Sequence, residues 1–514
     1  MPITHWSRVT PSKPAIIMAD TGDVVTFLEL EERSNQAAHL FRHLGLTAGD
    51  HIACVLENRP QFLELTWAAH RSGLIYTPIS THLTVDEAEY IIRDSDAKLI
   101  VLSERQLEIA SALTERLPNL TLRFIVAGAA LGFKSWERSI ANFPKTPIAD
   151  QSTGVDMCYS SGTTGKPKGV VKQTQVIAFG EPAAVNDRSV LRFGFDEDTI
   201  FLVPNPLYHS APLRHSMLVQ RFGGTVVLMG RFDAEVALKA IDQNRVNYAF
   251  FVPTMFVRLL NLPDSVRDAY ELSSLKTVTH AAAPCPTPVK EKMIEWLGPI
   301  ITELYGSTEE CGFTAISSDD WKNHKGSIGL PMEGIFHVLD DSGTEVEPGT
   351  PGTIWVEGGR QFEYYKDPMK TKLSRNENGW RTIGDVGYVD REGFVYLTDR
   401  TAFTINSGGV KIFPKEVEDL LCTHPAVADV AVFGVPDSEF GEQVKAVVEL
   451  KDAEGSNPEL ATELIEFCRT RLSRIKVPKS IEFEKLPRNP LGKLMKKVLK
   501  ERYWTTSSGT QSKA

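Results

Sequence analysis

The segment from residue 160 to residue 169 has the composition of a phosphate-binding loop. It reads Ser-Ser-Gly-Thr-Thr-Gly-Lys-Pro-Lys-Gly and follows a short apolar stretch, residues 155–159. Glycines let the backbone approach a ligand closely and point its N–H groups at that ligand. The hydroxyl groups and the ammonium groups of Lys166 and Lys168 complement phosphate oxygens. The segment therefore predicts a polyphosphate site, although a flexible surface loop can have the same composition.

Two common nucleotide-binding loops are excluded by the same residues. A P-loop requires Ser or Thr directly after its lysine, and Pro167 follows Lys166 here. The chain has no dinucleotide GxGxxG motif and no protein-kinase motif set. The loop is therefore expected to hold phosphates in a different way.

Three later segments carry charged groups that suit the rest of a nucleotide. Residues 305–309, Tyr-Gly-Ser-Thr-Glu, end in a carboxylate, and a Mg²⁺ ion that bridges phosphates needs few protein ligands beyond such an oxygen. Asp385, in the stretch Thr-Ile-Gly-Asp-Val-Gly, is suited to a vicinal diol, and a nearby arginine keeps a carboxylate ionised. Residues 487–493 place Lys493 after a glycine. Each segment alone could equally be a turn, a turn-capping aspartate or a solvated lysine.

In this order, the segments from residue 159 to residue 493 resemble the signature motifs of the adenylate-forming superfamily. This superfamily includes acyl- and aryl-CoA synthetases, firefly luciferase and the adenylation domains of nonribosomal peptide synthetases. The resemblance extends over essentially the whole chain. It implies an acid–CoA ligase that uses ATP, Mg²⁺ and coenzyme A. Such an enzyme activates a carboxylic acid as acyl-AMP, releases pyrophosphate, and then forms acyl-CoA and AMP.

The resemblance also implies roles for individual residues at the nucleotide. The loop would bind the β- and γ-phosphates, and Glu309 would coordinate Mg²⁺ with Ser160 as a second partner. Thr308 would contact the α-phosphate. The segment after His280 matches the adenine-facing strand, with histidine in place of the usual Gly or Ser. The expected nucleotide-binding residues are Ser160, Ser161, Gly162, Thr163, Thr164, Gly165, Lys168, Ala282, Ala283, Pro284, Tyr305, Gly306, Ser307, Asp385 and Arg400.

In the same superfamily a small C-terminal domain rotates between two half-reactions. Lys493 matches the lysine of the adenylation step. Gly408 and Gly409 match the glycines that line a tunnel for the pantetheine arm of CoA, where small side chains are needed. Ala402 replaces the usual Asp or Lys at the hinge, so no salt bridge is expected there. The expected catalytic residues are Lys493, Thr308, Glu309 and His209.

The segment Pro206-Leu-Tyr-His-Ser-Ala-Pro212 resembles the gate of the family's acyl pocket. Small residues among the expected walls favour a roomy apolar pocket, and hence a medium- or long-chain fatty acid or another bulky apolar acid. An aryl acid of the benzoate or cinnamate type is the alternative. Arg214 and His215 either meet a polar part of the ligands or lie on a helix surface. The expected pocket residues are Tyr208, Phe250, Ala281, Cys311 and Gly312.

The elements that position these residues alternate between helix and strand in the first part of the chain. Thr26 and Glu29 form the signature of a helix capping box, residues 51–56 form a short apolar strand, and Pro60 opens the next helix. This rhythm predicts an α/β fold with helix-covered parallel sheets. Between about residues 326 and 398, frequent Gly and Pro predict a small antiparallel, barrel-like β unit.

A chain of 514 residues exceeds what one hydrophobic core usually serves. We expect a large N-terminal AMP-binding domain over residues 1–399, followed by a small, mobile α+β domain over residues 400–504. Residues 505–514 are small and polar and are predicted to form a disordered tail.

The composition is that of a soluble enzyme, with 42% hydrophobic and 24% charged residues. A net charge of −10 gives no general reason to expect nucleic acid or an anionic membrane as a partner. The chain has no apolar run long enough to span a membrane and no secretory signal. We therefore expect a cytoplasmic enzyme whose partners are a small acid, ATP and CoA. The oligomeric state is left open, with a homodimer as one option.

Three alternative functions are compatible with the same motifs. A stand-alone adenylation enzyme would load a carrier protein instead of CoA, and no carrier domain is found in the chain. A luciferase-like monooxygenase would consume oxygen. An inactive binding protein is disfavoured by the retained Glu309, Asp385, Arg400 and Lys493.

Overall fold

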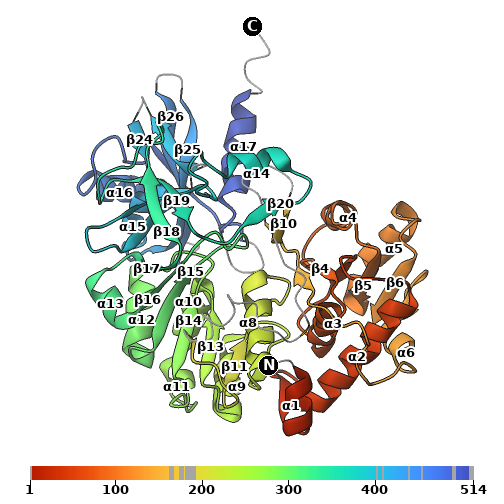
Figure 1. Ribbon diagram of the computed structural model, residues 1–514. Helices are drawn as coiled ribbons and strands as arrows, with labels where there is room; N and C mark the ends of the chain where they lie inside the picture. Colours follow the sequence, from red (N-terminus) through yellow and green to blue (C-terminus); the bar gives the residue numbers. More distant parts are fainter. Residues whose placement is uncertain are drawn as a thin grey trace. The chain divides into compact units, whose positions relative to one another are not determined.

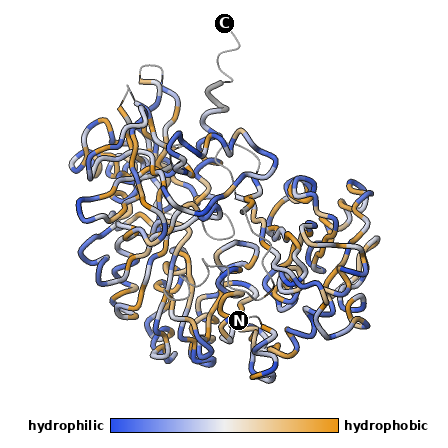
Figure 2. The backbone as a smooth tube through the Cα atoms, viewed as in Figure 1, coloured by the Kyte–Doolittle hydropathy of each residue, from blue (hydrophilic) through white to orange (hydrophobic). Residues whose placement is uncertain are grey.

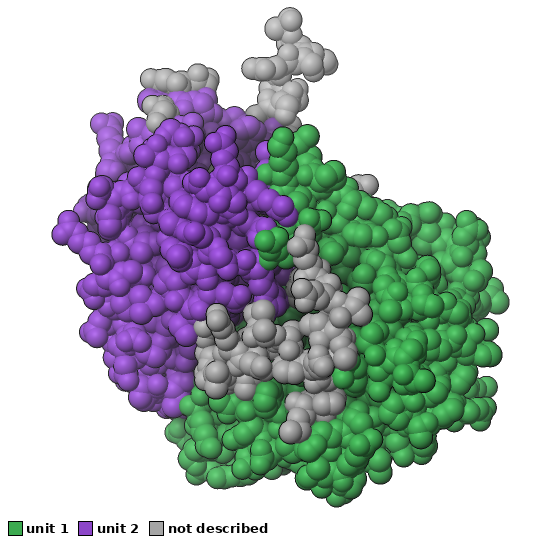
Figure 3. All heavy atoms as spheres, in the orientation of Figure 1, with its two compact units in different colours: residues 1–251, 258–279, 361–372 green, residues 252–257, 280–360, 373–514 purple. Residues whose placement is uncertain are grey.

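The computed structural model describes residues 3–160, 167–172, 179, 193–400, 403–407, 410–437, 440–452, 455–488 and 494–508. The chain divides into two compact units (Figure 3). Unit 1 comprises residues 1–251, 258–279 and 361–372, and unit 2 comprises residues 252–257, 280–360 and 373–514. The expected domain boundary between residues 399 and 400 lies within unit 2 and stays a prediction.

One part of unit 1 is a six-stranded sheet in the order β7-β6-β5-β3-β4-β8, with all neighbouring strands parallel (Figure 1). Residues from α4 and α5 pack against β3 and β5 in one apolar cluster that includes Ile91, Leu102 and Leu113. Figure 2 shows hydrophobic residues along these strands and a mixture of both kinds along the helices. The predicted helix-covered parallel sheet is therefore confirmed. Its elements are β3 (His51–Val55), α3 (Pro60–Arg71), β4 (Ile75–Pro78), α4 (Val85–Asp94), β5 (Leu99–Ser103), α5 (Leu107–Arg116), β6 (Leu122–Val126), β7 (Lys134–Ser135), α6 (Trp136–Ile140) and β8 (Val155–Asp156).

The predicted capping box opens α2 (Phe27–His43). The Thr26 hydroxyl accepts a hydrogen bond from the Glu29 backbone N–H, and the Glu29 carboxylate accepts one from the Thr26 backbone N–H at 2.9 Å. Two of the unpaired N–H groups at this helix end are thereby satisfied. The sequence signal was sufficient here because a cap depends only on residues within one helical turn.

The second part of unit 1 is a strand series in the order β14-β13-β11-β12-β1-β2. β1, β12, β11 and β13 pair in parallel, and β2 is antiparallel to β1. A separate antiparallel sheet, β9-β10-β20, contains both ends of the predicted phosphate loop. The elements are α1 (Ile3–Val9), β1 (Pro14–Met18), β2 (Val24–Thr26), β9 (Tyr159–Ser160), β10 (Lys168–Lys172), β11 (Ile200–Val203), α8 (Ser210–Arg221), β12 (Thr225–Leu228), α9 (Ala234–Asn244), β13 (Tyr248–Phe251), α11 (Asp264–Arg267), β14 (Thr277–His280) and β20 (Phe362–Tyr364).

Unit 2 begins with an antiparallel strand series in the order β15-β16-β17-β22-β21-β19-β18. It covers the region in which an antiparallel β unit is expected from frequent Gly and Pro. The elements are β15 (Ile301–Tyr305), β16 (Phe313–Ser317), β17 (Ser327–Glu333), β18 (Ile335–Leu339), β19 (Gly352–Glu357), β21 (Asp385–Val389) and β22 (Val395–Arg400), with helices α12 (Thr287–Leu297) and α13 (Ser318–Asn323). Helices α10 (Pro253–Leu260) and α14 (Pro368–Leu373) each include residues of both units.

The C-terminal part of unit 2 is a small α+β arrangement, as expected. Its sheet has the order β24-β23-β26-β25, with β27 parallel to β26. Residues of α15 and α16, such as Val417 and Leu464, pack on β25 and β26 in one buried cluster. The elements are β23 (Ile405–Ser407), β24 (Val410–Ile412), α15 (Pro414–Leu421), β25 (Val427–Asp437), β26 (Gly441–Leu450), α16 (Pro458–Arg469), β27 (Ser480–Phe483) and α17 (Lys496–Ser508).

Helix α17 continues four residues into the segment expected to be a disordered tail. It ends at Ser508, directly before Gly509 in the sequence. The segment 505–508 contains neither Pro nor Gly, so nothing in it stops a helix that has already formed. The rest of the expected tail lies outside the described residues. Within the described parts of the chain, no helix is both long and apolar enough to cross a membrane.

Candidate adenylation site

The two ends of the phosphate loop lie side by side on paired strands of unit 1. Ser160 on β9 pairs with Lys168 on β10, and Tyr159 pairs with Gly169. The Lys168 ammonium group lies 3.2 Å from a carboxylate oxygen of Asp367, and this contact raises the pKa of the lysine. Lys168 therefore stays protonated and keeps its charge. The expected phosphate-binding residues Ser161, Gly162, Thr163, Thr164 and Gly165 lie outside the described residues.

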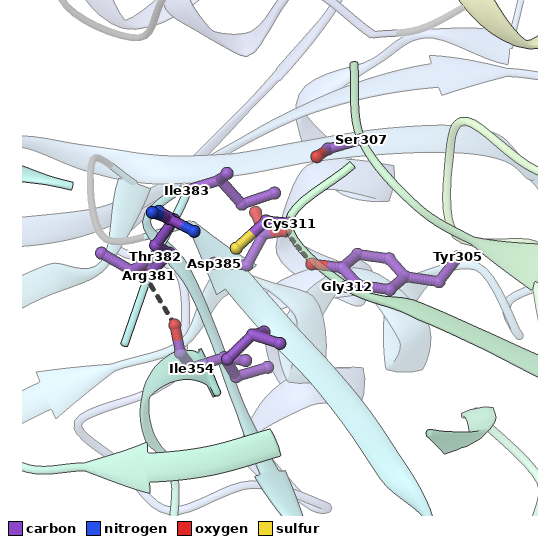
Figure 4. Close-up of a pocket in the computed structure, with 10 residues that line it drawn as sticks. Tyr305, Ser307, Cys311, Gly312, Ile354, Arg381, Thr382, Ile383 and Asp385 are labelled. Atoms are coloured by element: carbon purple, nitrogen blue, oxygen red, sulfur yellow. Dashed lines mark hydrogen bonds between the residues drawn. The ribbon is translucent and has the colours of Figure 1, made fainter. Parts of the chain in front are cut away.

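A pocket in unit 2 brings together several of the expected nucleotide residues (Figure 4). Tyr305 ends β15, and Asp385 begins β21. The Tyr305 hydroxyl donates a hydrogen bond to the Asp385 carboxylate at 2.6 Å, as Figure 4 shows. Residues expected to face adenine and ribose thus contact each other directly. The pocket is lined by Tyr305, Ser307, Cys311, Gly312, Ile354, Val356, Arg381, Thr382, Ile383 and Asp385.

A tight turn before Asp385 orients its carboxylate. The Thr382 hydroxyl donates to the carbonyl of Ile354 at 2.7 Å and accepts from the N–H of Gly384 at 3.1 Å. Gly384 has φ of 80°, a left-handed conformation that favours glycine. Asp385 is buried. The register of the two strands places Asp385 opposite Arg400 across the β21–β22 pair, so the two residues expected at the ribose are cross-strand neighbours.

The residues expected at the α-phosphate and the metal lie in the turn after β15. Gly306 is exposed, Thr308 is half-buried and Glu309 is buried. Among the described residues, no cluster of three or more His, Cys, Asp or Glu could hold a metal ion. A single buried carboxylate fits Mg²⁺, which commonly binds through one or two carboxylates, substrate phosphates and water. The Glu309 carboxylate is therefore a suitable oxygen ligand for the expected ion. Ser160, the expected second ligand, belongs to unit 1, so its position relative to Glu309 stays a prediction.

The adenine-side segment follows β14 directly. Ala281 and Ala283 are half-buried, Ala282 and Pro284 are exposed, and Ala282 has φ of 73°. His280 is fully buried, and neither ring nitrogen has a hydrogen-bond partner among the described residues.

The surroundings of His280 explain why a histidine is tolerated at this position. The ring lies 3.6 Å from the carboxylate of Glu303, which forms a 2.7 Å ion pair with the buried Lys290. Burial and the nearby ammonium group hold the pKa of His280 well below its usual range, so the ring is neutral. His280 is therefore a core residue behind the segment and not a ligand of the nucleotide.

The gate segment of unit 1 is held in place by Asn58, a residue that the sequence patterns did not single out. Its amide group donates to the carbonyls of Asn205 at 2.9 Å and Met229 at 2.8 Å. Its carbonyl oxygen accepts from the N–H of Leu207 at 2.7 Å. Tyr208 follows with a buried ring and a pKa raised by burial. No motif marks Asn58 because its partners are distant in the sequence.

His209 is the N-cap residue of α8, and its ring lies 4.6 Å from that of Tyr208. Phe250 is buried in β13, and its carbonyl accepts a hydrogen bond from the Asn205 amide at 2.7 Å. Tyr208 and His209 thus lie in the segment between β11 and α8 of unit 1, and Phe250 is hydrogen-bonded to the same segment through Asn205.

The two polar residues after the gate have structural partners. Arg214 donates to the Asp156 carboxylate at 2.6 Å, and this carboxylate is itself largely buried. His215 is half-buried, and its ring lies 5.3 Å from the rings of Phe193 and Phe250. Burial lowers the pKa of His215 to about 4. Neither residue lies on an exposed helix surface.

Several C-terminal motif residues lie outside the described residues, namely Gly408, Gly409, Lys493 and the hinge residue Ala402.

Two arginines that the sequence patterns did not identify lie in unit 2: Arg381 lines the pocket, and Arg360 pairs with Glu310. Arg381 stands four residues before Asp385. Its closeness to the motif of Asp385 in the sequence is the one feature that could have marked it as a residue of the site.

Comparison with known proteins identifies the family of the chain. Residues 3–366 match the model of the AMP-binding enzyme family, and residues 416–493 match the AMP-binding enzyme C-terminal domain. A 2-succinylbenzoate–CoA ligase of Bacillus licheniformis is 33% identical over 500 residues, covering 96% of this chain and 98% of that protein. A long-chain-fatty-acid–CoA ligase of Mycobacterium tuberculosis is 30% identical over 510 residues, covering 97% of each chain.

A solved structure with the same architecture is o-succinylbenzoate CoA synthetase from Bacillus subtilis, in complex with its acyl-adenylate intermediate. It is 27% identical, has a TM-score of 0.81, and the match covers 97% of this chain and 98% of that one. These matches confirm the expected superfamily, the fold class and the expectation of an enzyme. The chain belongs to the AMP-binding enzyme family of adenylate-forming enzymes.

Proposed function

We propose that this protein is an ATP-dependent acid–CoA ligase that forms an acyl-AMP intermediate. The observation that carries the proposal is the pocket of unit 2, where Tyr305 contacts Asp385 and where Asp385 is the cross-strand neighbour of Arg400. An aromatic ring beside a carboxylate suits a nucleoside, because the base can stack on the ring and the two hydroxyls of the ribose diol can donate hydrogen bonds to the carboxylate oxygens. The names of the two relatives described above, both CoA ligases, support the same assignment.

The first half-reaction needs an activated acid, because a free carboxylate is a poor electrophile. The acid oxygen attacks the α-phosphorus of ATP, and pyrophosphate leaves. Catalysis of such a step depends mainly on positioning and on neutralising charge. Lys168 would bind the outer phosphates with the rest of the loop, Thr308 would contact the α-phosphate, and Lys493 would lie between the acid and that phosphate. Glu309 would hold Mg²⁺, and Ser160 is the proposed second ligand. The ion would supply positive charge at the phosphates.

In the second half-reaction the thiol of CoA attacks the acyl carbonyl and AMP leaves. We assign Gly408 and Gly409 to the path of the pantetheine arm, since only small side chains admit a thin thiol chain. The domain over residues 400–504 would rotate between the two half-reactions, about a hinge near Ala402. A hinge needs only to absorb a change in φ and ψ, so the absence of a charged residue there does not prevent rotation.

The substrate that we favour is a medium- or long-chain fatty acid or another bulky apolar acid. His209 and Tyr208 at the gate, with Phe250 and Ala281, would form part of its site. An aryl acid is the second candidate. One relative is named for a long-chain fatty acid and another for 2-succinylbenzoate, so the names support both classes.

A pyrophosphate-release assay with a panel of acids tests the substrate. Fatty acids of graded length, benzoate, cinnamate, acetate and amino acids should be compared at equal concentration. We expect bulky apolar acids to give the highest kcat/KM. Strong preference for acetate or an amino acid would overturn the assignment of the substrate. If acyl-AMP forms but free CoA does not accept the acyl group, loading of a carrier protein would be favoured. Cytoplasmic localisation and a homodimer stay predictions.

A further inference from the structure

The turn that carries Glu309 has an unusual backbone conformation. The next residue, Glu310, has φ of 52°. This is the left-handed region, which a residue with a Cβ adopts only at a cost in free energy. The backbone N–H of Glu310 donates to the carbonyl of Ser307 at 3.1 Å and closes a tight turn after β15. Some other contact must stabilise a glutamate in this position.

The loop 358–360 supplies that contact. The Arg360 guanidinium donates to the Glu310 carboxylate, and only 26% and 18% of the two side chains are exposed. Gly359 lies so close to Cys311 that a Cβ at that position would be 1.7 Å from the Cys311 carbonyl oxygen. The loop and the turn therefore contact each other through both backbone and side chains.

Arg360 is itself held on two sides. Its carbonyl accepts a hydrogen bond from Nη1 of Arg381 at 3.3 Å, and its Nε lies 3.7 Å from a carboxylate oxygen of Glu333. Arg381 lines the same pocket as Tyr305 and Asp385 (Figure 4). A continuous set of contacts thus leads from the nucleotide pocket to the residue that adjoins Glu309.

We propose that Arg360 is a positioning residue, whose ion pair with Glu310 holds the neighbouring Glu309 carboxylate in the orientation needed for the Mg²⁺ of MgATP. This inference rests on the proposed function, in which Glu309 is a metal ligand. Mg²⁺ demands a nearly regular octahedron of ligands. Residues that orient a metal ligand typically change metal affinity by about 10- to 100-fold. An ion pair with only a structural role would alter stability and leave the dependence on Mg²⁺ unchanged.

Glu310→Gly separates the two roles. Glycine adopts φ of 52° freely, so this variant removes the ion pair while relieving the backbone. We expect its thermal unfolding midpoint to equal or exceed that of the wild type. The Mg²⁺ concentration for half-maximal ATP binding should nevertheless rise about tenfold. Arg360→Ala should raise it similarly, Arg360→Lys should restore part of the loss, and the double variant should add little, because both changes remove one interaction.

The measurement is calorimetric binding of ATP at increasing Mg²⁺ concentrations, without acid or CoA, so that it does not depend on the acid. Glu333→Gln is the control, since Glu333 also faces Arg360 but does not adjoin Glu309. It should keep the Mg²⁺ dependence of the wild type. Unchanged dependence in both Glu310→Gly and Arg360→Ala would overturn the positioning role. A wild type that binds no ATP at any Mg²⁺ concentration would overturn the proposed function, whereas ATP binding that needs no Mg²⁺ would overturn this inference alone.

Discussion

The hydroxyl of Tyr305 and the carboxylate of Asp385 form a direct polar contact in the proposed nucleotide pocket. A hydroxyl that donates to a buried carboxylate satisfies one of its acceptor positions and restricts its rotation. The contact therefore prepares Asp385 to accept hydrogen bonds from a diol.

Tyr305→Phe should weaken ATP binding without unfolding the protein. Loss of this hydrogen bond is worth about 1 kcal/mol, or roughly a fivefold rise in the KM for ATP. Pyrophosphate release at varied ATP concentration checks it. Tyr388→Phe is the control, because Tyr388 lies on the same strand as Asp385 and its stacking on Tyr396 needs no hydroxyl. A lower KM in Tyr305→Phe would mean that the hydroxyl competes with ribose for Asp385.

Two half-buried histidines, His70 and His215, should make the protein sensitive to acid. Burial lowers the pKa of His70 and of His215 to about 4, below the value near 6.5 of an unfolded chain. Between these values the unfolded state binds more protons, so stability is complete above pH 6.5 and falls as the pH drops towards 4. For each histidine, the loss at pH 5 is about 2 kcal/mol.

Thermal unfolding at pH 7.5 and pH 5.0 checks the role of His215. His215→Leu should show a smaller decrease in the unfolding midpoint between the two pH values than the wild type. His82→Gln, which alters an exposed histidine, should show the same decrease as the wild type. Equal decreases in all three proteins would contradict the assignment of His215 as a neutral residue.

At the scale of elements, strand β11 of unit 1 is held at both ends by asparagine side chains. Asn58 binds the segment that follows the strand, through the carbonyl of Asn205 and the N–H of Leu207. Asn247 binds the segment that leads into it, through the N–H of Ile200 at 2.9 Å and the carbonyl of Asp198 at 2.8 Å. Only the first of these segments leads into the gate residues and α8.

Asn58→Ala should reduce stability and also impair binding of the acid. It leaves buried backbone groups unpaired, at a cost of about 1–3 kcal/mol, and it releases the segment before Tyr208 and His209. The KM for the acid should rise, while the KM for ATP changes less. Asn247→Ala is the matched control, expected to lower the unfolding midpoint without raising the KM for the acid. If both variants raise that KM equally, the gate is not positioned by Asn58.

At the scale of the whole molecule, the proposed function assigns the two half-reactions to different motifs of the C-terminal region. Lys493 belongs to the adenylation step, and Gly409 belongs to the transfer to CoA. Two lysines that follow Lys493 in the sequence have structural partners: Lys496 pairs with Glu418 at 2.7 Å, and Lys497 pairs with Glu501 at 3.6 Å within α17. The two steps should therefore be separable by mutation.

Lys493→Ala should slow acyl-AMP formation by about 100-fold or more, because a positioned charge at the reacting phosphate is removed, and should spare transfer from added acyl-AMP to CoA. Gly409→Leu should do the reverse, since a leucine side chain would obstruct the pantetheine arm. Single-turnover measurements of each step check this. Lys497→Ala should leave both steps unchanged. If each variant slowed both steps equally, the assignment to separate motifs would be wrong.

The amino-acid sequence by itself determined the family, the alternation of helices and parallel strands, the helix cap at Thr26 and the motif segments of the site. These features depend on residues that are close in the chain, so local patterns report them. Asp385 and Tyr305, for example, each lie in a recognisable short motif.

Only the tertiary structure decided which of these groups meet. Tyr305 and Asp385 are 80 residues apart, Glu310 and Arg360 are 50 apart, and Asn58 and Asn205 are 147 apart. Each contact depends on the order and register of strands, which a local pattern does not encode. The same reason explains why a local pattern left the surroundings of His215 open, whereas the fold packs its ring among aromatic side chains.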